Sequence, residues 1–79
     1  MKRGDNMDNN TRRFTLKALR AISGLTQDEA AKRLKISPQT LSAWENGTTF
    51  PTVPDINKIE ALYNASYEEI DFLTDSISV

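Results

Sequence analysis

Side chains suited to contacting a base pair lie in a short run that begins at Ser37. Gln39 carries an amide that both donates and accepts, so it matches the N7 and N6 groups of adenine in the major groove. Thr40 offers its methyl group to thymine or its hydroxyl to a phosphate, and Ala43 offers van der Waals contact alone. Together these residue types predict recognition of DNA, with Gln39 as the base reader.

Other residues near this run are candidates for contacts with the DNA. They are polar or charged, or they stand in the first turn of a helix, where free N–H groups attract phosphate. The set is Lys17, Arg20, Gln27, Ser37, Pro38, Ser42, Asn46, Thr48 and Thr49, with Arg12 and Arg13 before them. The alternative for each is a solvated surface position, and the Ser37 hydroxyl is alternatively used wholly in capping a helix.

Two short helices joined by a tight turn are predicted between Thr26 and Gly47, and they would position these side chains. Thr26 and Glu29 have the spacing of a capping box at the start of the first helix. Ala30–Ala31 and Leu34 then form a narrow apolar stripe at helical spacing. The small alanines let a second helix approach closely, as a sharp two-helix corner requires.

The second helix of this pair has clear signals at both ends. Ser37 is a good N-cap, and Pro38 suits the first helical position, where no N–H is needed. Leu41 and Trp44 are three residues apart and are expected to face the core. Gly47 is expected to end the helix in the left-handed conformation. A helix with its N-terminal tip exposed in this way is what a protein inserts into the major groove.

The turn between the two helices is expected to hold Lys35 and Ile36. Lys35 is expected in the left-handed conformation, which glycine adopts with less strain. Ile36 is expected to attach the turn to the core.

The chain of 79 residues has room for one small domain. We expect a flexible polar arm over residues 1–13, a helical domain over 14–74 and a frayed tail over 75–79. Further helices are expected from Thr15 to Ser23, from Thr52 to Tyr63, and as a short fifth helix opened by a capping box of Ser66 and Glu69. The pattern contains no strand signal.

Several large apolar residues lie outside the clearest helical stripes. Phe50 is expected to be tucked against the core, and Ile70 and Leu73 are expected to be buried by the fifth helix. Phe72, Ile77 and Val79 are residues that a monomer need not bury, so they are candidates for a dimer or partner interface. Scattered surface apolar residues are the alternative.

Composition excludes several classes of protein. The chain has no cysteine and no histidine, so it lacks a disulfide framework, thiolate ligands and the commonest general base. We therefore expect no enzyme activity, no metal and no cofactor. No apolar run approaches the roughly 20 residues that span a bilayer, and the N-terminus has no hydrophobic region of a secretory signal. We expect a cytoplasmic protein with no membrane contact.

Charge is unevenly distributed along the chain, although the net charge is only −1. Residues 1–20 carry a net +4 and residues 47–79 a net −5, and the segment between them is neutral. Such a molecule can turn a positive face to phosphates and its acidic end away from them. The alternative is that this unevenness is ordinary for a small acidic protein.

These motifs together resemble the phage repressor/Cro-type (Xre-like) helix-turn-helix domain. The resemblance extends from about Leu16 to Leu73. The residues that carry it are Leu16-x-x-Leu19-Arg20, Gly24-Leu25-Thr26-Gln27, Ala30-Ala31, Leu34-x-Ile36-Ser37, Leu41, Trp44-Glu45-Asn46-Gly47 and Pro51. It implies an all-α fold, a compact five-helix bundle of the lambda-repressor-like type, with the helix-turn-helix at the second and third helices.

The resemblance also implies a function and several residue roles. It implies transcriptional repression through a homodimer on the half-sites of a palindromic operator in double-stranded DNA. Gln27 would meet the DNA near the groove edge, and Arg20 and Glu45 would form a bridge that orients the recognition helix. Pro38 and Ala43 stand where relatives often carry polar base-contacting side chains, so specificity would rest on fewer bonds or on DNA shape.

A second class of function is an antitoxin-like protein-interaction module that binds a protein partner and its own operator. Such a module would use the apolar residues near the C-terminus. Sequence-specific binding that weakens steeply with salt would favour the regulator, whereas tight binding to a protein partner without sequence preference would favour the module.

Overall fold

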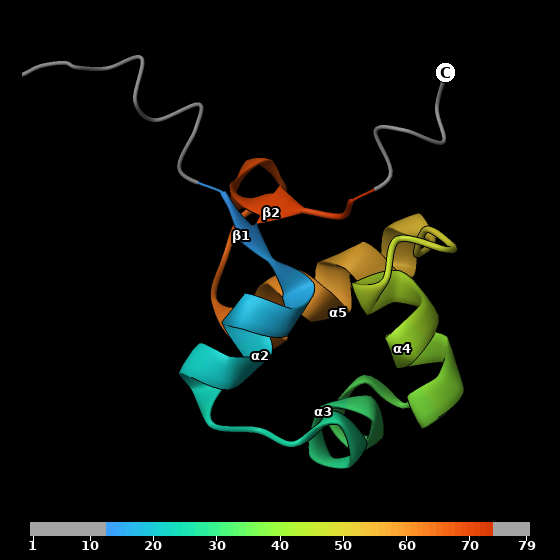
Figure 1. The fold of residues 1–79 in the computed structure, drawn as a ribbon. Coiled ribbons are helices and arrows are strands. Elements are labelled where there is room, and N and C mark those ends of the chain that lie inside the picture. The colour runs from blue at the N-terminus through green and yellow to red at the C-terminus, as the bar shows by residue number, and fades with distance from the viewer. Residues whose placement is uncertain (1–12, 74–79) are drawn as a thin grey trace, which may run out of the picture.

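A computed structural model describes residues 13–73. This part of the chain contains four α-helices, one 3₁₀ turn and two very short strands, arranged as in Figure 1. Their bounds are β1 Phe14–Thr15, α2 Leu16–Ser23, α3 Gln27–Leu34, α4 Pro38–Glu45, α5 Val53–Tyr63, the 3₁₀ turn Tyr67–Glu69 and β2 Ile70–Asp71. The predicted all-α character is therefore correct in broad terms.

Each of the four helices begins after a hydroxyl residue that caps it. The caps are Thr15, Thr26, Ser37 and Thr52, and each hydroxyl accepts the N–H three residues further on. Such a bond satisfies one of the N–H groups that a helix start leaves without a partner. The predicted starts of these helices are confirmed, because their determinants lie within one turn of sequence.

The helix ends also follow from local sequence. Gly24, Lys35 and Asn64 adopt the left-handed conformation, with φ values of 75°, 61° and 53°. The expectation for Lys35 is confirmed. At the end of α4, Asn46 is right-handed and the left-handed residue is Gly47, with φ of 76°. Three of the four helices thus stop at a backbone geometry that ordinary side chains disfavour.

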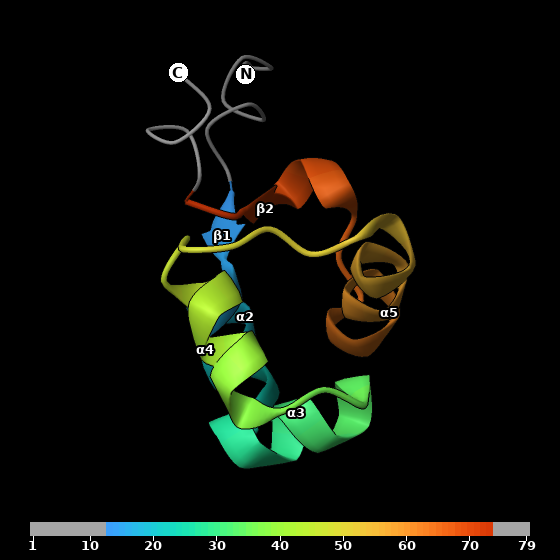
Figure 2. The same ribbon diagram turned by 90° about the vertical axis from the view of Figure 1, so that its right-hand side faces the viewer.

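A single apolar core connects these elements. Its buried side chains are Leu16, Leu19, Ala30, Ala31, Leu34, Leu41, Trp44, Ile59, Tyr63, Ile70 and Phe72. In both views α3 lies at one end of the molecule and the two strands at the other, with α4 running between these ends (Figures 1 and 2). Trp44 is buried as predicted, so its ring serves the core rather than stacking on bases.

The predicted fifth helix is wrong. Residues Tyr67–Glu69 make one 3₁₀ turn, and Ile70–Asp71 then form a strand that pairs in parallel with Phe14–Thr15. The Ser66 N–H donates to the Glu69 carboxylate at 2.9 Å, so this part of the predicted cap is present. Forming the first turn of a helix is unfavourable unless further turns follow it. Here the backbone groups after the turn, in Ile70 and Asp71, pair with β1 instead.

This extended backbone reverses the predicted burial of Phe72 and Leu73, whereas Ile70 is buried as predicted. Ile70 and Phe72 are buried, whereas Leu73 is 43% exposed. Side chains alternate between the two faces of an extended chain, so Ile70 and Phe72, two residues apart, share the inner face. The prediction paired Ile70 with Leu73, three residues away, which holds only in a helix. Phe72 is therefore a core residue and is removed from the predicted interface.

Phe50 is only partly covered, contrary to the prediction that it is tucked against the core. Its side chain is 46% exposed, and its ring lies 5.0 Å from that of Phe72, measured between centroids. Tyr67 packs on Phe72 from a centroid distance of 5.8 Å and is also half-exposed. The two outer rings cover Phe72, which explains why they remain at the surface themselves.

Residues 1–12 and 74–79 lie outside the described part of the chain. The predicted arm and tail, and the roles suggested for Arg12, Ile77 and Val79, therefore stay predictions. None of the helices described between residues 13 and 73 is long and apolar enough to cross a membrane. Within the same range, no group of three or more His, Cys, Asp or Glu residues is arranged to hold a metal ion.

Candidate nucleic-acid interface

The corner between α3 and α4 is built from buried small side chains and a tight turn. Ala30 and Ala31 are fully buried, so the helices meet through methyl groups. The Ile36 N–H donates to the Ala31 carbonyl at 3.0 Å, and the Lys35 N–H donates to the Lys32 carbonyl at 3.1 Å. These bonds close the end of α3, and the half-buried Ile36 packs against the core as predicted. The corner is therefore held by both packing and backbone bonds.

The first turns of α4 face solvent. Pro38 and Gln39 are exposed, and Thr40, Ser42 and Ala43 are half-buried. Leu41, between them, is completely buried and fixes the helix on the core. The structure thus places the side chain of the predicted base reader, Gln39, at the surface of the helix.

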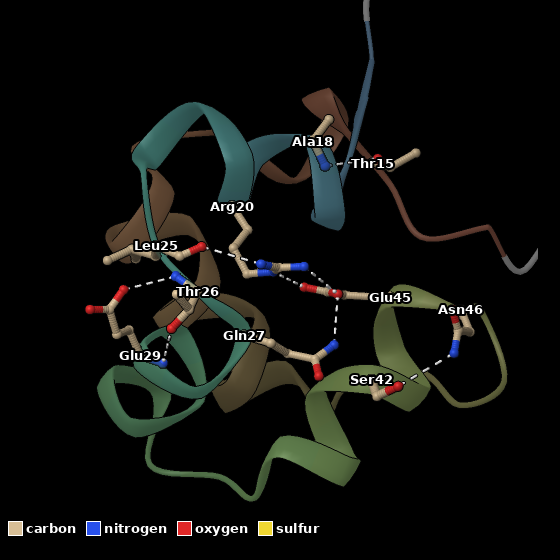
Figure 3. Close-up of polar contacts among 10 residues, drawn as sticks. All are labelled: Thr15, Ala18, Arg20, Leu25, Thr26, Gln27, Glu29, Ser42, Glu45 and Asn46. Atoms are coloured by element: carbon tan, nitrogen blue, oxygen red, sulfur yellow. Dashed lines mark hydrogen bonds and ion pairs between the residues drawn. The ribbon is translucent and has the colours of Figure 1, made fainter.

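The hydroxyl groups of this surface already have partners within the protein. The Ser37 hydroxyl accepts the Thr40 N–H at 3.1 Å and shares a second hydrogen bond with the Thr40 hydroxyl at 3.0 Å. The Asn46 amide donates to the Ser42 hydroxyl at a long 3.4 Å (Figure 3). Ser37 is used in capping, which was one of the two alternatives for it.

An ion pair joins α2 to the end of α4. Arg20 Nε donates to Glu45 Oε2 at 2.7 Å, and Arg20 Nη2 donates to Glu45 Oε1 at 3.3 Å. The side chains are 15% and 2% exposed, respectively. Arg20 Nη1 also donates to the Leu25 carbonyl at 3.2 Å. Figure 3 shows the guanidinium between these two acceptors, so it is oriented at both ends.

Gln27, at the start of α3, is a third member of this cluster. Its Nε2 donates to Glu45 Oε1 at 3.1 Å, and its side chain is half-buried (Figure 3). Glu45 therefore accepts bonds from α2 and from α3 and ties both helices to α4. The sequence contains no local signal for the bond with Gln27, because 18 positions separate the two residues.

Electrostatics at the cluster favour the charged pair. The hydrogen bond with Glu45 raises the pKa of the Arg20 guanidinium, and this effect exceeds the opposing effect of burial. Burial, reinforced by the nearby Glu45 charge, raises the pKa of the Tyr63 hydroxyl to about 12. That hydroxyl has no hydrogen-bond partner within residues 13–73. Tyr63 thus stays neutral beside the pair.

The remaining candidates are distributed around α2 and the end of α4. Lys17 is exposed on α2, and Asn46, Thr48 and Thr49 are exposed after α4. The Thr48 and Thr49 N–H groups both donate to the Ala43 carbonyl, at 2.9 and 3.4 Å, so these two N–H groups already have an acceptor. Their hydroxyls, at exposed positions, are the groups suited to contact a phosphate.

Arg13 and the cations of α3 add to the positive groups. Arg13 is exposed and donates to the Ile70 carbonyl at 3.5 Å, which associates it with the strands. Lys32, Arg33 and Lys35 are exposed at the end of α3, shortly before α4 begins. None of the three is among the DNA contacts predicted from the sequence, which assigns Lys35 only to the turn between the two helices.

Comparison with known proteins agrees with this geometry. A family model described as "Helix-turn-helix" matches residues 16–70. An uncharacterised HTH-type transcriptional regulator of Methanocaldococcus jannaschii is 38% identical over 55 residues, which cover 70% of this chain and 83% of that protein. No solved structure matches the chain significantly. The matched range includes α2 to α5 and ends at Ile70, the first residue of β2.

Proposed function

Because the chain belongs to the helix-turn-helix family, in its phage repressor/Cro-type (Xre-like) form, we propose that it is a sequence-specific regulator of transcription that binds double-stranded DNA. The observation that carries the proposal is the exposed tip of α4 on a rigid corner. Gln39 faces solvent there, while Leu41 and Glu45 of the same helix are buried. A helix held in this way suits insertion into the major groove.

In this proposal the exposed face of α4 reads base edges, and its surroundings bind the backbone. Gln39 forms a bidentate pair with adenine. Lys17, Gln27, Asn46 and Thr48 contact phosphates or sugars, which set the position and orientation of the domain without reading sequence. Gln27 can do so while its amide also donates to Glu45, because its carbonyl oxygen and second N–H have no bond to protein among the described residues.

We further propose that the regulator is a repressor of phage or mobile-element type that acts as a homodimer on a palindromic operator. Two copies would place two α4 helices about 34–36 Å apart, one helical turn of DNA. The similarity to a protein named as a transcriptional regulator supports the regulatory role. The proposal needs no cofactor, no catalytic residue and no membrane, and it places the protein in the cytoplasm.

The direct test is selection of bound sequences from a random duplex pool. We expect a recovered palindrome whose half-sites are spaced by about one helical turn. The selected duplex and a scrambled duplex are then titrated at two salt concentrations. Binding should prefer the selected duplex, and affinity for both should fall steeply as salt rises, because phosphate contacts release counterions. Recovery of no preferred sequence would contradict the proposal.

A second candidate function, an antitoxin-like interaction module, is favoured by one specific observation. Four exposed apolar side chains lie on or next to the two strands: Phe14 is part of β1, Phe50 and Tyr67 pack on Phe72, and Leu73 follows β2 by two residues. Figure 2 shows the two strands at the end of the molecule opposite α3. Surfaces of this kind mark protein contacts when they are contiguous. A tight complex with a co-purified protein, together with no preference between the selected and scrambled duplexes, would favour this function.

A further inference from the structure

The recognition helix carries no cation with which to read guanine. Its sequence from Pro38 to Glu45 contains one ionisable side chain, Glu45, which is buried and bonded to Arg20. The commonest specific contact in the major groove is an arginine or lysine that binds guanine O6 and N7. That contact is therefore unavailable to the described surface of α4.

The hydroxyls of the helix are also poor candidates for base reading. Those of Ser37 and Thr40 are bonded to each other at 3.0 Å, and that of Ser42 accepts a bond from Asn46. A hydroxyl that has a partner inside the protein gains little when it exchanges that partner for a base. The part of the Thr40 side chain without a polar partner is its methyl group.

Helical geometry brings this methyl group together with the amide. Gln39 and Ala43 are four residues apart on the face opposite Leu41, so they are neighbours one turn apart. Thr40 and Ala43 are three apart, so their methyl groups also lie on adjacent positions. Both residues are half-buried, at the margin of the exposed face. The centre of this face is thus one amide bordered by two methyl groups.

From this surface we infer that α4 reads A·T pairs, by an adenine bond from Gln39 and by contact of the Thr40 and Ala43 methyl groups with the C5-methyl groups of thymine. An A·T pair offers both partners in the major groove, whereas cytosine has no methyl group there. The operator half-site is therefore A·T-rich where α4 enters. This inference rests on the proposed function and names the DNA sequence class that it requires.

The test replaces thymines of the selected duplex one at a time with deoxyuridine, which keeps the pairing edge and removes only the methyl group. We expect the affinity to fall about fourfold for each contacted thymine that is replaced. This ratio corresponds to the free energy of burying one methyl-sized carbon group. Replacement of a contacted A·T pair by a G·C pair that carries 5-methylcytosine should restore the methyl contact, although not the adenine bond.

Two variants of Thr40 separate the methyl group from the hydroxyl. Thr40→Ser removes the methyl and keeps the hydroxyl, so it should make one thymine position insensitive to deoxyuridine. Thr40→Val keeps a methyl and removes the hydroxyl, so that position should stay sensitive. Both variants keep the backbone N–H that donates to Ser37, and circular dichroism checks that each is folded. Ala43→Gly removes the other methyl group, and circular dichroism again checks the fold, because glycine costs about 1 kcal/mol in a helix interior.

The outcomes distinguish the inference from the function beneath it. Selected half-sites that require guanine and are indifferent to deoxyuridine would overturn the inference and leave the regulator intact. Deoxyuridine sensitivity that is unchanged in both Thr40→Ser and Ala43→Gly would overturn the assignment of the methyl groups. Absence of any preferred sequence would overturn the proposed function, and the inference with it.

Discussion

The Glu45 carboxylate accepts hydrogen bonds from Arg20 and from Gln27, and thereby connects three helices through one side chain. A buried ion pair often adds little net stability, because both ions lose their hydration. The effect of this ion pair on the arrangement of the helices is clearer. The Glu45 carboxylate can accept hydrogen bonds from both Arg20 and Gln27 only when α2, α3 and α4 are arranged as they are here. We regard Glu45 as the residue that sets the direction of the recognition helix.

Glu45→Gln should destabilise the protein by about 3 kcal/mol, because it leaves the largely buried Arg20 guanidinium without its counter-ion. Denaturation by urea gives the free energy of unfolding for this comparison. Arg33→Gln is a matched control, since Arg33 is exposed on α3 and its removal should change stability by no more than about 0.5 kcal/mol. Equal stabilities for the two variants would show that the pair is not needed for the fold.

A substitution of Gln39 should change DNA recognition without changing the stability of the fold. Its side chain is exposed, so Gln39→Ala should leave the melting temperature nearly unchanged. It should also relax discrimination at one base pair by about 1–3 kcal/mol, the value of a bidentate contact. Binding is measured against duplexes that vary each position of the half-site. Unchanged discrimination at every position would rule out Gln39 as the reader.

At the scale of elements, short helices depend on their ends. α2, α3 and α4 have eight residues each, fewer than the roughly 12–15 that make an isolated helix even marginally stable in water. Caps at the start and left-handed residues at the end reduce the number of unpaired backbone groups. Packing on the shared core supplies the rest of their stability.

The capping box of α3 should make stability depend on pH. The Thr26 N–H donates to the Glu29 carboxylate at 2.8 Å, and this bond lowers the pKa of Glu29 from 4.5. A carboxylate whose pKa is lower in the folded state stabilises the fold at pH values above its pKa in the unfolded chain. This stabilisation is lost as the pH falls through the pKa in the folded state. The melting temperature should therefore fall more steeply between pH 6 and pH 3 in the wild type than in Glu29→Gln. Parallel curves for the two proteins would contradict this assignment.

At the scale of the whole molecule, the strands and the loop after α4 hold the far end together. β1 and β2 join the two ends of the described chain, and the Phe50 and Tyr67 rings cover Phe72 beside them. Gly47 lies against this region, since a Cβ atom there would collide with the Leu73 carbonyl oxygen. The end of the recognition helix is thus coupled sterically to the C-terminal part of the domain.

Alanine substitutions at two glycines distinguish the cost of backbone strain from the cost of this steric contact. Gly24 and Gly47 have nearly equal φ values of 75° and 76°, but a Cβ at Gly24 would meet nothing within 4 Å. Gly24→Ala should therefore cost only about 1–2 kcal/mol for the left-handed conformation. Gly47→Ala should cost at least about 1 kcal/mol more, because the chain near Leu73 must also move. Equal losses of unfolding free energy would show that the loop and Leu73 are not in firm contact.

The sequence by itself determined the helix-turn-helix and its exposed recognition face. Caps act across three residues and core stripes across three or four, so both can be read from neighbouring positions, as at Thr26 and at Leu41 with Trp44. The tertiary structure alone decided the bond from Gln27 to Glu45 and the replacement of the fifth helix by a strand. These depend on residues 18 and more than 50 positions apart. Such contacts form only when the whole chain is packed, because loop closure and competing backbone partners decide them.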